Sequence, residues 1–237
     1  MRRLLAAATA AASLALVLST GASAAGPYVS GTTGYDVSYP QCGVTVTGTF
    51  GVIGVNGGRP FSQNPCLAGE YATSSSGGAY LNTGYARTYA KRITTDCQTR
   101  SAGYVGSSAQ QQAYAIGCSE AQYSESYTAG QGVVPPVWWL DVETANSWST
   151  SNLTLNQATI QGLADTLEGT GAWVGVYSTG SQWGQIAGAG WTPAGISATW
   201  VAGASASTAA GYCSRSFTTA PVWLVQYVAT YDQDYAC

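Results

Sequence analysis

The chain has 237 residues, of which 46% are apolar and only 8% are charged, against roughly 25% in a typical soluble protein. Eight Lys and Arg stand against eleven Asp and Glu, so a basic surface for the phosphate backbone of nucleic acid is not expected. The lack of histidine excludes Ser-His-Asp and Cys-His catalysis and zinc sites that contain histidine. Any acid or base catalysis must therefore rest mainly on carboxylates.

Residues 1–24 have the pattern of a secretory signal peptide. Arg2 and Arg3 precede an apolar run over 4–18 that is too short and too rich in alanine for a membrane span, and the segment 22–24 reads Ala-Ser-Ala, a small-residue cleavage site. Without the two arginines, six basic residues stand against eleven acidic ones, a net charge of −5. We therefore expect a secreted, extracellular protein with no membrane partner, in which residues 25–237 form one monomeric domain.

Six cysteines in an exported chain predict three disulfides. Six cysteines allow 15 pairings. The most economical pairing joins neighbours in sequence: Cys42 with Cys66, Cys97 with Cys118, and Cys213 with Cys237. A metal site built from cysteines is disfavoured because no Cys-x-x-Cys spacing occurs, and we expect neither a metal nor a cofactor.

Strand patterns and helix patterns alternate along the mature chain. Strands are predicted over 34–38, 50–56, 79–83, 137–143, 172–178, 198–204, 222–228 and 231–235. Helices are predicted through 67–72 and over 107–129, 155–168 and 181–187. Because the strands are continuously apolar and the helices are concentrated in the first two-thirds, the pattern indicates an α/β fold, a single parallel TIM-like barrel whose last helices are reduced.

The fourth predicted strand ends in two acids. In Val137-Trp-Trp-Leu-Asp-Val-Glu143, Asp141 and Glu143 are two residues apart and therefore project to the same side of the strand, roughly 6.6 Å apart along it at about 3.3 Å per residue. They lie at the carboxyl end of the strand, where barrel enzymes build their active sites. A carboxylate pair approached by aromatic side chains is what cleavage of a glycosidic bond requires, and Trp139 is the aromatic residue assigned to sugar binding. The alternative is that both acids are solvated or cap the following loop.

Two further acids occupy equivalent places. Asp36 lies at the end of the first strand, and Asp232 lies in the last one, near Asp234. In a closed barrel these two strands are neighbours, so Asp36 and Asp232 can converge beside Asp141 and Glu143. The alternative is that they are turn acids in Asx-type hydrogen bonds.

Several segments, in chain order, resemble the glycoside hydrolase family 25 lysozymes, which are N-acetylmuramidases, and the related secreted domains. The most specific are the DVS at 36–38, the LDVE at 140–143, the GVYS at 175–178 with its following Trp, and the W-x-x-Q-Y at 223–227 before a terminal Asp. This resemblance covers nearly all of the mature chain and implies a (β/α)5(β)3 barrel. It also implies hydrolysis of the β-1,4 bonds between N-acetylmuramic acid and N-acetylglucosamine in peptidoglycan.

The resemblance assigns roles to individual residues. Glu143 corresponds to the general acid, and Asp141 to its partner, which orients the substrate's acetamido group or stabilises the developing charge. Asp36 and Asp232 correspond to carboxylates of the pocket, and Tyr177 and Gln226 to wall residues that contact sugar.

The sequence departs from the family pattern at the ends of the second and third strands. Here Asn56-Gly-Gly58 replaces a Lys- or Glu-containing stretch, and Tyr80-Leu-Asn-Thr83 replaces an aromatic-rich strand. Asn56 and Asn82 could hydrogen-bond a different sugar, or they could simply form the turns at the strand ends. Three hypotheses follow: a muramidase-like glycosidase, the same barrel acting on another extracellular polysaccharide, and a glycan-binding barrel without catalysis.

Overall fold

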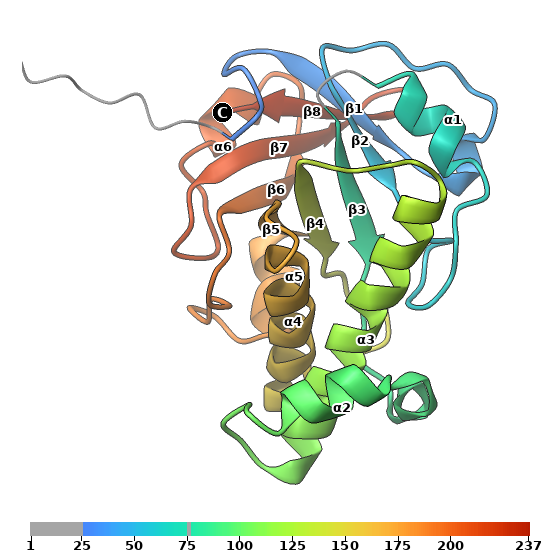
Figure 1. Cartoon of the computed structure of the whole chain (residues 1–237). Coiled ribbons are helices and arrows are strands. Elements are labelled where there is room, and N and C mark those ends of the chain that lie inside the picture. The colour runs from blue at the N-terminus through green and yellow to red at the C-terminus, as the bar shows by residue number, and fades with distance from the viewer. Residues whose placement is uncertain (1–25, 75–76) are drawn as a thin grey trace, which may run out of the picture.

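The computed structural model describes residues 26–74 and 77–237, so the predicted signal peptide lies outside the described residues. Eight strands form one closed barrel in the order of the chain (Figure 1). They are β1 (Thr33–Val37), β2 (Gly51–Gly54), β3 (Gly78–Asn82), β4 (Val137–Asp141), β5 (Trp173–Ser178), β6 (Ala198–Ala204), β7 (Val222–Val228) and β8 (Asp232–Ala236). The predicted TIM-like α/β barrel is confirmed, and each predicted strand is present.

The direction of the last strand corrects the expectation of a wholly parallel barrel. Strands β1 to β7 pair in parallel, but β8 runs antiparallel to both of its neighbours, β7 and β1. The reason is the length of the connection: only 229–231 separate β7 from β8, and a parallel crossover needs a dozen or more residues. The chain therefore turns back in a hairpin, and the beginning of β8 lies at the end of the barrel where the other strands finish.

The helices are concentrated in the first part of the chain, as predicted. They are α1 (Leu67–Ala72), α2 (Thr95–Ser101), α3 (Ser108–Gly130), α4 (Leu153–Glu168), α5 (Gly180–Ile186) and α6 (Ala209–Tyr212), with the 3-10 turns η1 (Tyr39–Gln41) and η2 (Arg87–Arg92). Ser107 caps α3 and Asn152 caps α4 by accepting hydrogen bonds from backbone N–H groups. Gly117 and Gly162 let these two helices pack closely, because a Cβ on either would collide with the backbone of the other helix. Within the described residues, no helix combines the length and the apolar character needed to span a bilayer.

Alternation along the strands divides the buried side chains into two layers. On β4, Trp139 points into the barrel, where it packs with Tyr177 and Trp200. Its neighbours Trp138 and Leu140 point outward into the layer beneath the helices. This is the alternation expected of a barrel strand, and it places Asp141 on the interior face.

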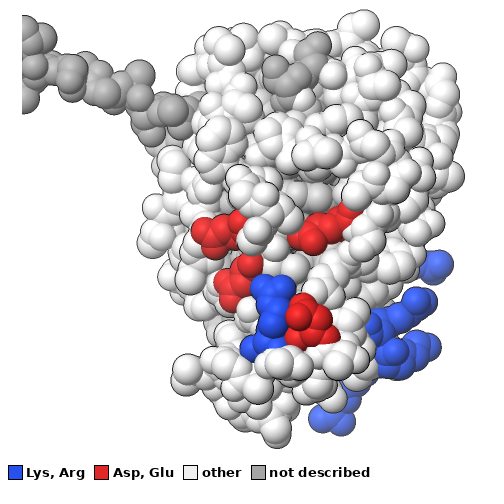
Figure 2. Space-filling view, viewed as in Figure 1, with Lys and Arg blue, Asp and Glu red and all other residues white. Residues whose placement is uncertain are grey.

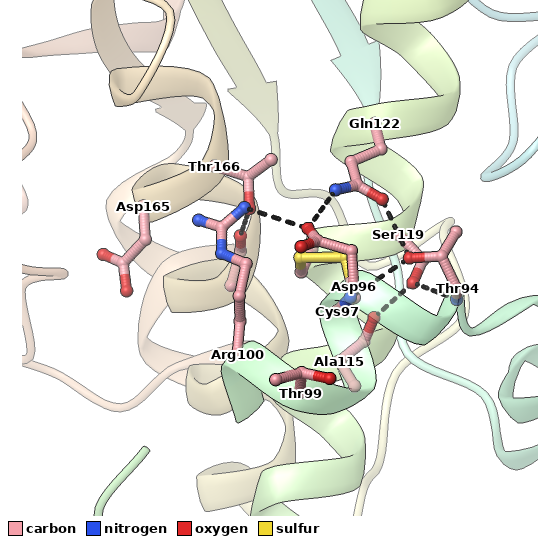
Figure 3. A network of polar contacts seen from close by, with 12 residues as sticks. Thr94, Asp96, Cys97, Thr99, Arg100, Ala115, Ser119, Gln122, Asp165 and Thr166 are labelled. Carbon is pink, nitrogen blue, oxygen red and sulfur yellow. Dashed lines mark hydrogen bonds and ion pairs between the residues drawn. A yellow bond between two sulfur atoms is a disulfide. The ribbon is translucent and has the colours of Figure 1, made fainter. Parts of the chain in front are cut away.

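All three disulfides join the predicted partners: Cys42 with Cys66, Cys97 with Cys118, and Cys213 with Cys237. The second one fastens α2 to α3, within the polar network of Figure 3. There the amide of Gln122 on α3 donates to Asp96 and accepts from the hydroxyl of Thr94. The segment between β3 and α3 is therefore held in place by covalent and polar links.

The third disulfide ties the segment after α6 to the end of β8, and we expect its removal to loosen the closing strand. A Cys213→Ser, Cys237→Ser variant should lose about 2–4 kcal/mol in free energy of unfolding, since the disulfide restricts the unfolded chain. Urea unfolding followed by tryptophan fluorescence measures this. The Cys42–Cys66 disulfide has the same sequence separation of 24 residues, so its removal is expected to cost a similar free energy of unfolding. An unchanged free energy of unfolding in the Cys213→Ser, Cys237→Ser variant would contradict the prediction.

Candidate functional site

A polar hollow of about 150 Å³ lies inside the barrel, at the end where β1 to β7 finish. Carboxylate, amide and aromatic side chains converge there from seven segments of the chain. Its lining consists of Asp36, Tyr80, Asn82, Asp141, Glu143, Tyr177, Trp200, Gln226 and Asp232. The structure thus brings together seven of the nine side chains that the sequence assigned to catalysis and binding.

Strand register explains how Asp36 and Asp232 meet. On β1 and β8, Tyr35 pairs with Gln233 and Gly34 with Asp234, so the same register continued by one residue sets Asp36 opposite Asp232. Because β8 is antiparallel, its first residue lies beside the last residues of β1. The convergence predicted for these two acids is present, although the strand direction differs from the prediction.

Asp141 and Glu143 enter the hollow from β4 and from the residues just beyond it. The amide of Asn82, its register partner on β3, donates to one oxygen of Asp141, whereas the other oxygen, Oδ1, is buried without a hydrogen-bond partner. Glu143 is more exposed, and its backbone carbonyl accepts a hydrogen bond from the indole N–H of Trp148 at 2.9 Å. Asp141 therefore lies at the base of the hollow and Glu143 at its open side.

Burial favours the protonated form of the carboxyl groups in this hollow. It raises the pKa of Asp36 to about 7, even though an amide N–H of Gln226 favours the charged form. Burial also raises the pKa of Asp141 well above its usual range, with a further contribution from the negative charge of Glu143. Since no cation lines the hollow, one or more of these carboxyls hold a proton at neutral pH.

Tyr177 and Gln226 form a relay of hydrogen bonds to Asp36. The hydroxyl of Tyr177 donates to Oε1 of Gln226 at 2.7 Å, and Nε2 of Gln226 donates to Oδ2 of Asp36 at 2.9 Å. Burial raises the pKa of Tyr177, so its hydroxyl remains a donor. Both side chains line the hollow, which is where wall residues that contact a sugar are expected.

Asn56 and Trp139 do not line the hollow, so their assignment to sugar binding is not supported by their positions. Both polar groups of the Asn56 amide bond to the backbone of Asn82, which fixes the ends of β2 and β3 together. Trp139 is fully buried two residues before Asp141, roughly 6.6 Å deeper along β4, and its indole N–H donates to the hydroxyl of Tyr28. Trp139 is therefore a core residue beneath the site.

Three residues of this region were not assigned to the site from the sequence. Tyr80 lines the hollow, and its alternation with Asn82 on β3 is the signal that could have identified it. Trp200 also lines the hollow and donates from its indole N–H to Asp234 at 2.8 Å. The carboxyls of Asp234 and Asp36 lie within hydrogen-bonding reach of each other when one is protonated, and burial raises the pKa of both.

The architecture of the barrel is similar to that of several solved structures. The described barrel matches the muramidase from Trichobolus zukalii (TM-score 0.51, 16% identity), the muramidase from Acremonium alcalophilum (0.52, 17%) and the family GH25 lysozyme from Aspergillus fumigatus (0.54, 15%), each over 87% of this chain and 93% of the other. The chain has the GH25 lysozyme fold. No family model matches the sequence, and no curated protein is significantly similar to it.

A larger hollow of this GH25-like barrel, about 560 Å³, lies at the opposite end, where β4 and β5 begin. Its lining is mainly apolar and includes Val134, Pro136 and Trp173, with Glu125 as the one acid. A cleft that cleaves a glycan needs two converging carboxylates, so the smaller acidic hollow is the candidate active site. The described residues that lie close enough together to hold a metal are Asp96, Cys97 and Cys118, whose cysteines are consumed by a disulfide.

Proposed function

We propose that this protein is a secreted glycosidase that hydrolyses β-1,4 bonds of a cell-wall amino-sugar glycan, as a muramidase does. The observation that carries the proposal is the convergence of Asp141 and Glu143 with Asp36 and Asp232 in one hollow at the carboxyl end of the barrel. The GH25 fold of the comparison structures supports the same reaction class.

In this proposal Glu143 protonates the leaving glycosidic oxygen. Its side chain lies at the open side of the hollow, where the bond to be cleaved can reach it, while Asp141 is only 4% exposed. Burial raises the pKa of the neighbouring Asp141, which favours the protonated form of that carboxyl beside Glu143.

Asp141 supplies the second carboxyl group. Its Oδ2 is held by the amide of Asn82, so its orientation is fixed, and its buried Oδ1 has no partner. In this proposal the Asp141 carboxyl accepts from the acetamido N–H of the substrate, which places the acetamido carbonyl oxygen beside the anomeric carbon as the glycosidic bond breaks. A water molecule then supplies the hydroxyl group that ends on the anomeric carbon, which completes the hydrolysis. Asp36, Asp232, Tyr177 and Gln226 complete the wall with donors and acceptors for sugar hydroxyls.

Release of reducing ends tests the proposal directly. Purified peptidoglycan, chitin and a neutral β-glucan should be incubated with the protein, and the new ends identified by borohydride reduction and mass spectrometry. Muramic acid at the new reducing ends is the expected result. Glucosamine at the new ends, or release from the other polymers, would show that the protein cleaves a different bond or substrate. Tight binding to peptidoglycan without any new reducing ends would indicate a glycan-binding barrel.

A further inference from the structure

The basic residues of the mature chain are gathered beside the acidic hollow. Four of the six lie on the two loops that follow β2 and β3, and all four are exposed: Arg59, Arg87, Lys91 and Arg92. None of them forms a salt bridge in the described part of the chain, where the recorded pair is Arg100 with Asp96. We call these four residues the basic ledge.

Contacts between the loops place the basic ledge at the rim of the active-site end. The ring of Phe61 packs on Tyr89 of η2 at 5.5 Å between centroids, and Arg92 lies over the same ring. Strands β3 and β4 point toward the end of the molecule where α2 lies (Figure 1), and Lys and Arg side chains project together there (Figure 2). The ledge therefore lies on the carboxyl side of the barrel, with the hollow.

A third hollow, of about 430 Å³, lies between Arg87 of the ledge and the loop that follows Glu143. It is lined by Tyr85 and Arg87 from the loop after β3 and by Trp148 from the loop after β4. The backbone N–H of Tyr85 donates to the carbonyl of Ser147 at 2.7 Å, and Trp148 is bonded to the backbone of Glu143. The acidic hollow is small, so a polymer bound there must continue over the surface beside it.

We propose that the basic ledge and the Tyr85–Trp148 hollow bind the carboxylates of the peptide stems on a peptidoglycan strand whose sugar lies in the acidic hollow. Four unpaired cations attract carboxylates, while the uncharged donors and acids of the inner hollow suit a sugar. The Cys97–Cys118 disulfide and the network of Thr94, Asp96 and Gln122 hold the ledge segment on α3, so binding needs little ordering of the chain. This inference rests on the proposed function and specifies its substrate as a glycan with anionic peptides.

The test compares intact peptidoglycan, freed of wall polymers that carry phosphate, with the same glycan after an amidase has removed its stems. The protein should show a KM about tenfold lower for the intact form, and an Arg59→Gln, Arg87→Gln, Lys91→Gln variant should lose that preference. A variant that carries only Arg87→Lys should keep most of the preference, because the charge is kept. The control is Arg215→Gln, which removes a cation from the other end of the barrel, where it lies over Tyr212.

The outcomes separate this inference from the proposed function. An equal KM for both glycans, or a preference that survives in the triple variant, would overturn the role of the basic ledge even if hydrolysis is found. If no hydrolysis occurs, binding to the two glycans immobilised on the same support gives the same comparison: stronger, salt-sensitive binding to the intact form supports the ledge, and equal binding refutes it.

Discussion

Replacing Glu143 with glutamine is expected to reduce the rate of peptidoglycan cleavage by a factor of about 10² to 10⁴, with little change in KM. The amide keeps the shape of the side chain but cannot deliver a proton to the leaving oxygen, and positioned general acids contribute about this factor. Initial rates of reducing-end release measure it. Far-ultraviolet circular dichroism should be unchanged, because Glu143 lies at the open side of the hollow and not in the core.

Glu125→Gln is the matched control for this experiment. Glu125 is the acid of the large apolar hollow at the other end of the barrel, and the same isosteric change there should leave the rate unaltered. A loss of activity in Glu125→Gln together with full activity in Glu143→Gln would show that the active site is the apolar hollow and not the acidic one. Asp141→Asn should also lower the rate, because it replaces the carboxyl that faces the substrate.

The free energy of unfolding is expected to be higher at pH 4 than at pH 7. Every acid whose pKa departs from its ordinary value departs upward through burial: Asp36, Glu70, Glu120, Glu125, Asp141, Asp232 and Asp234. A raised folded-state pKa stabilises the protein fully below the unfolded value, near 4, and this stabilisation is lost as the pH rises through the folded value. For Asp36, a rise from 3.8 to about 7 corresponds to about 4 kcal/mol lost over that range. Urea unfolding at a series of pH values measures the slope.

Substitution of Glu120 tests the expected pH dependence of the free energy of unfolding most directly. It is fully buried on α3, and neither of its carboxyl oxygens has a hydrogen-bond partner. Glu120→Gln should match the parent at pH 4 and exceed its stability at pH 7, since the amide cannot ionise. The control is Glu168→Gln, at an exposed position, which should keep the parent's slope. A parent whose stability rises from pH 4 to 7 would contradict the burial of neutral carboxyls.

Much of the candidate site follows from alternation along strands. The two-residue spacing of Asp141 and Glu143 predicted a shared face, and both side chains line the hollow. The adjacency of the first and last strands in a barrel predicted the meeting of Asp36 and Asp232. These predictions succeeded because they depend only on local geometry and on closure of the barrel.

Other features depend on depth and on long-range contacts, which alternation does not describe. Trp139 faces the interior as an inward residue should, but it lies too deep to contact a ligand. Asn56 lies at a strand end, but both polar groups of its side-chain amide form hydrogen bonds with the backbone of β3. The position of η2 is set by its packing on Phe61 and α3, so the basic ledge could not be placed from the sequence pattern.

We expect the pocket to form late in folding, because β1 and β8 must pair to complete it. Strand β1 finds its second partner about two hundred residues further along the chain, so that pairing has one of the longest closure distances the fold contains. Until β8 fills the gap between β1 and β7, Asp36 has neither Asp232 nor Asp234 beside it, and both neighbouring strands expose an unpaired edge. Assembly of the carboxylate cluster and protection of the sheet against edge-to-edge association are thus the same event.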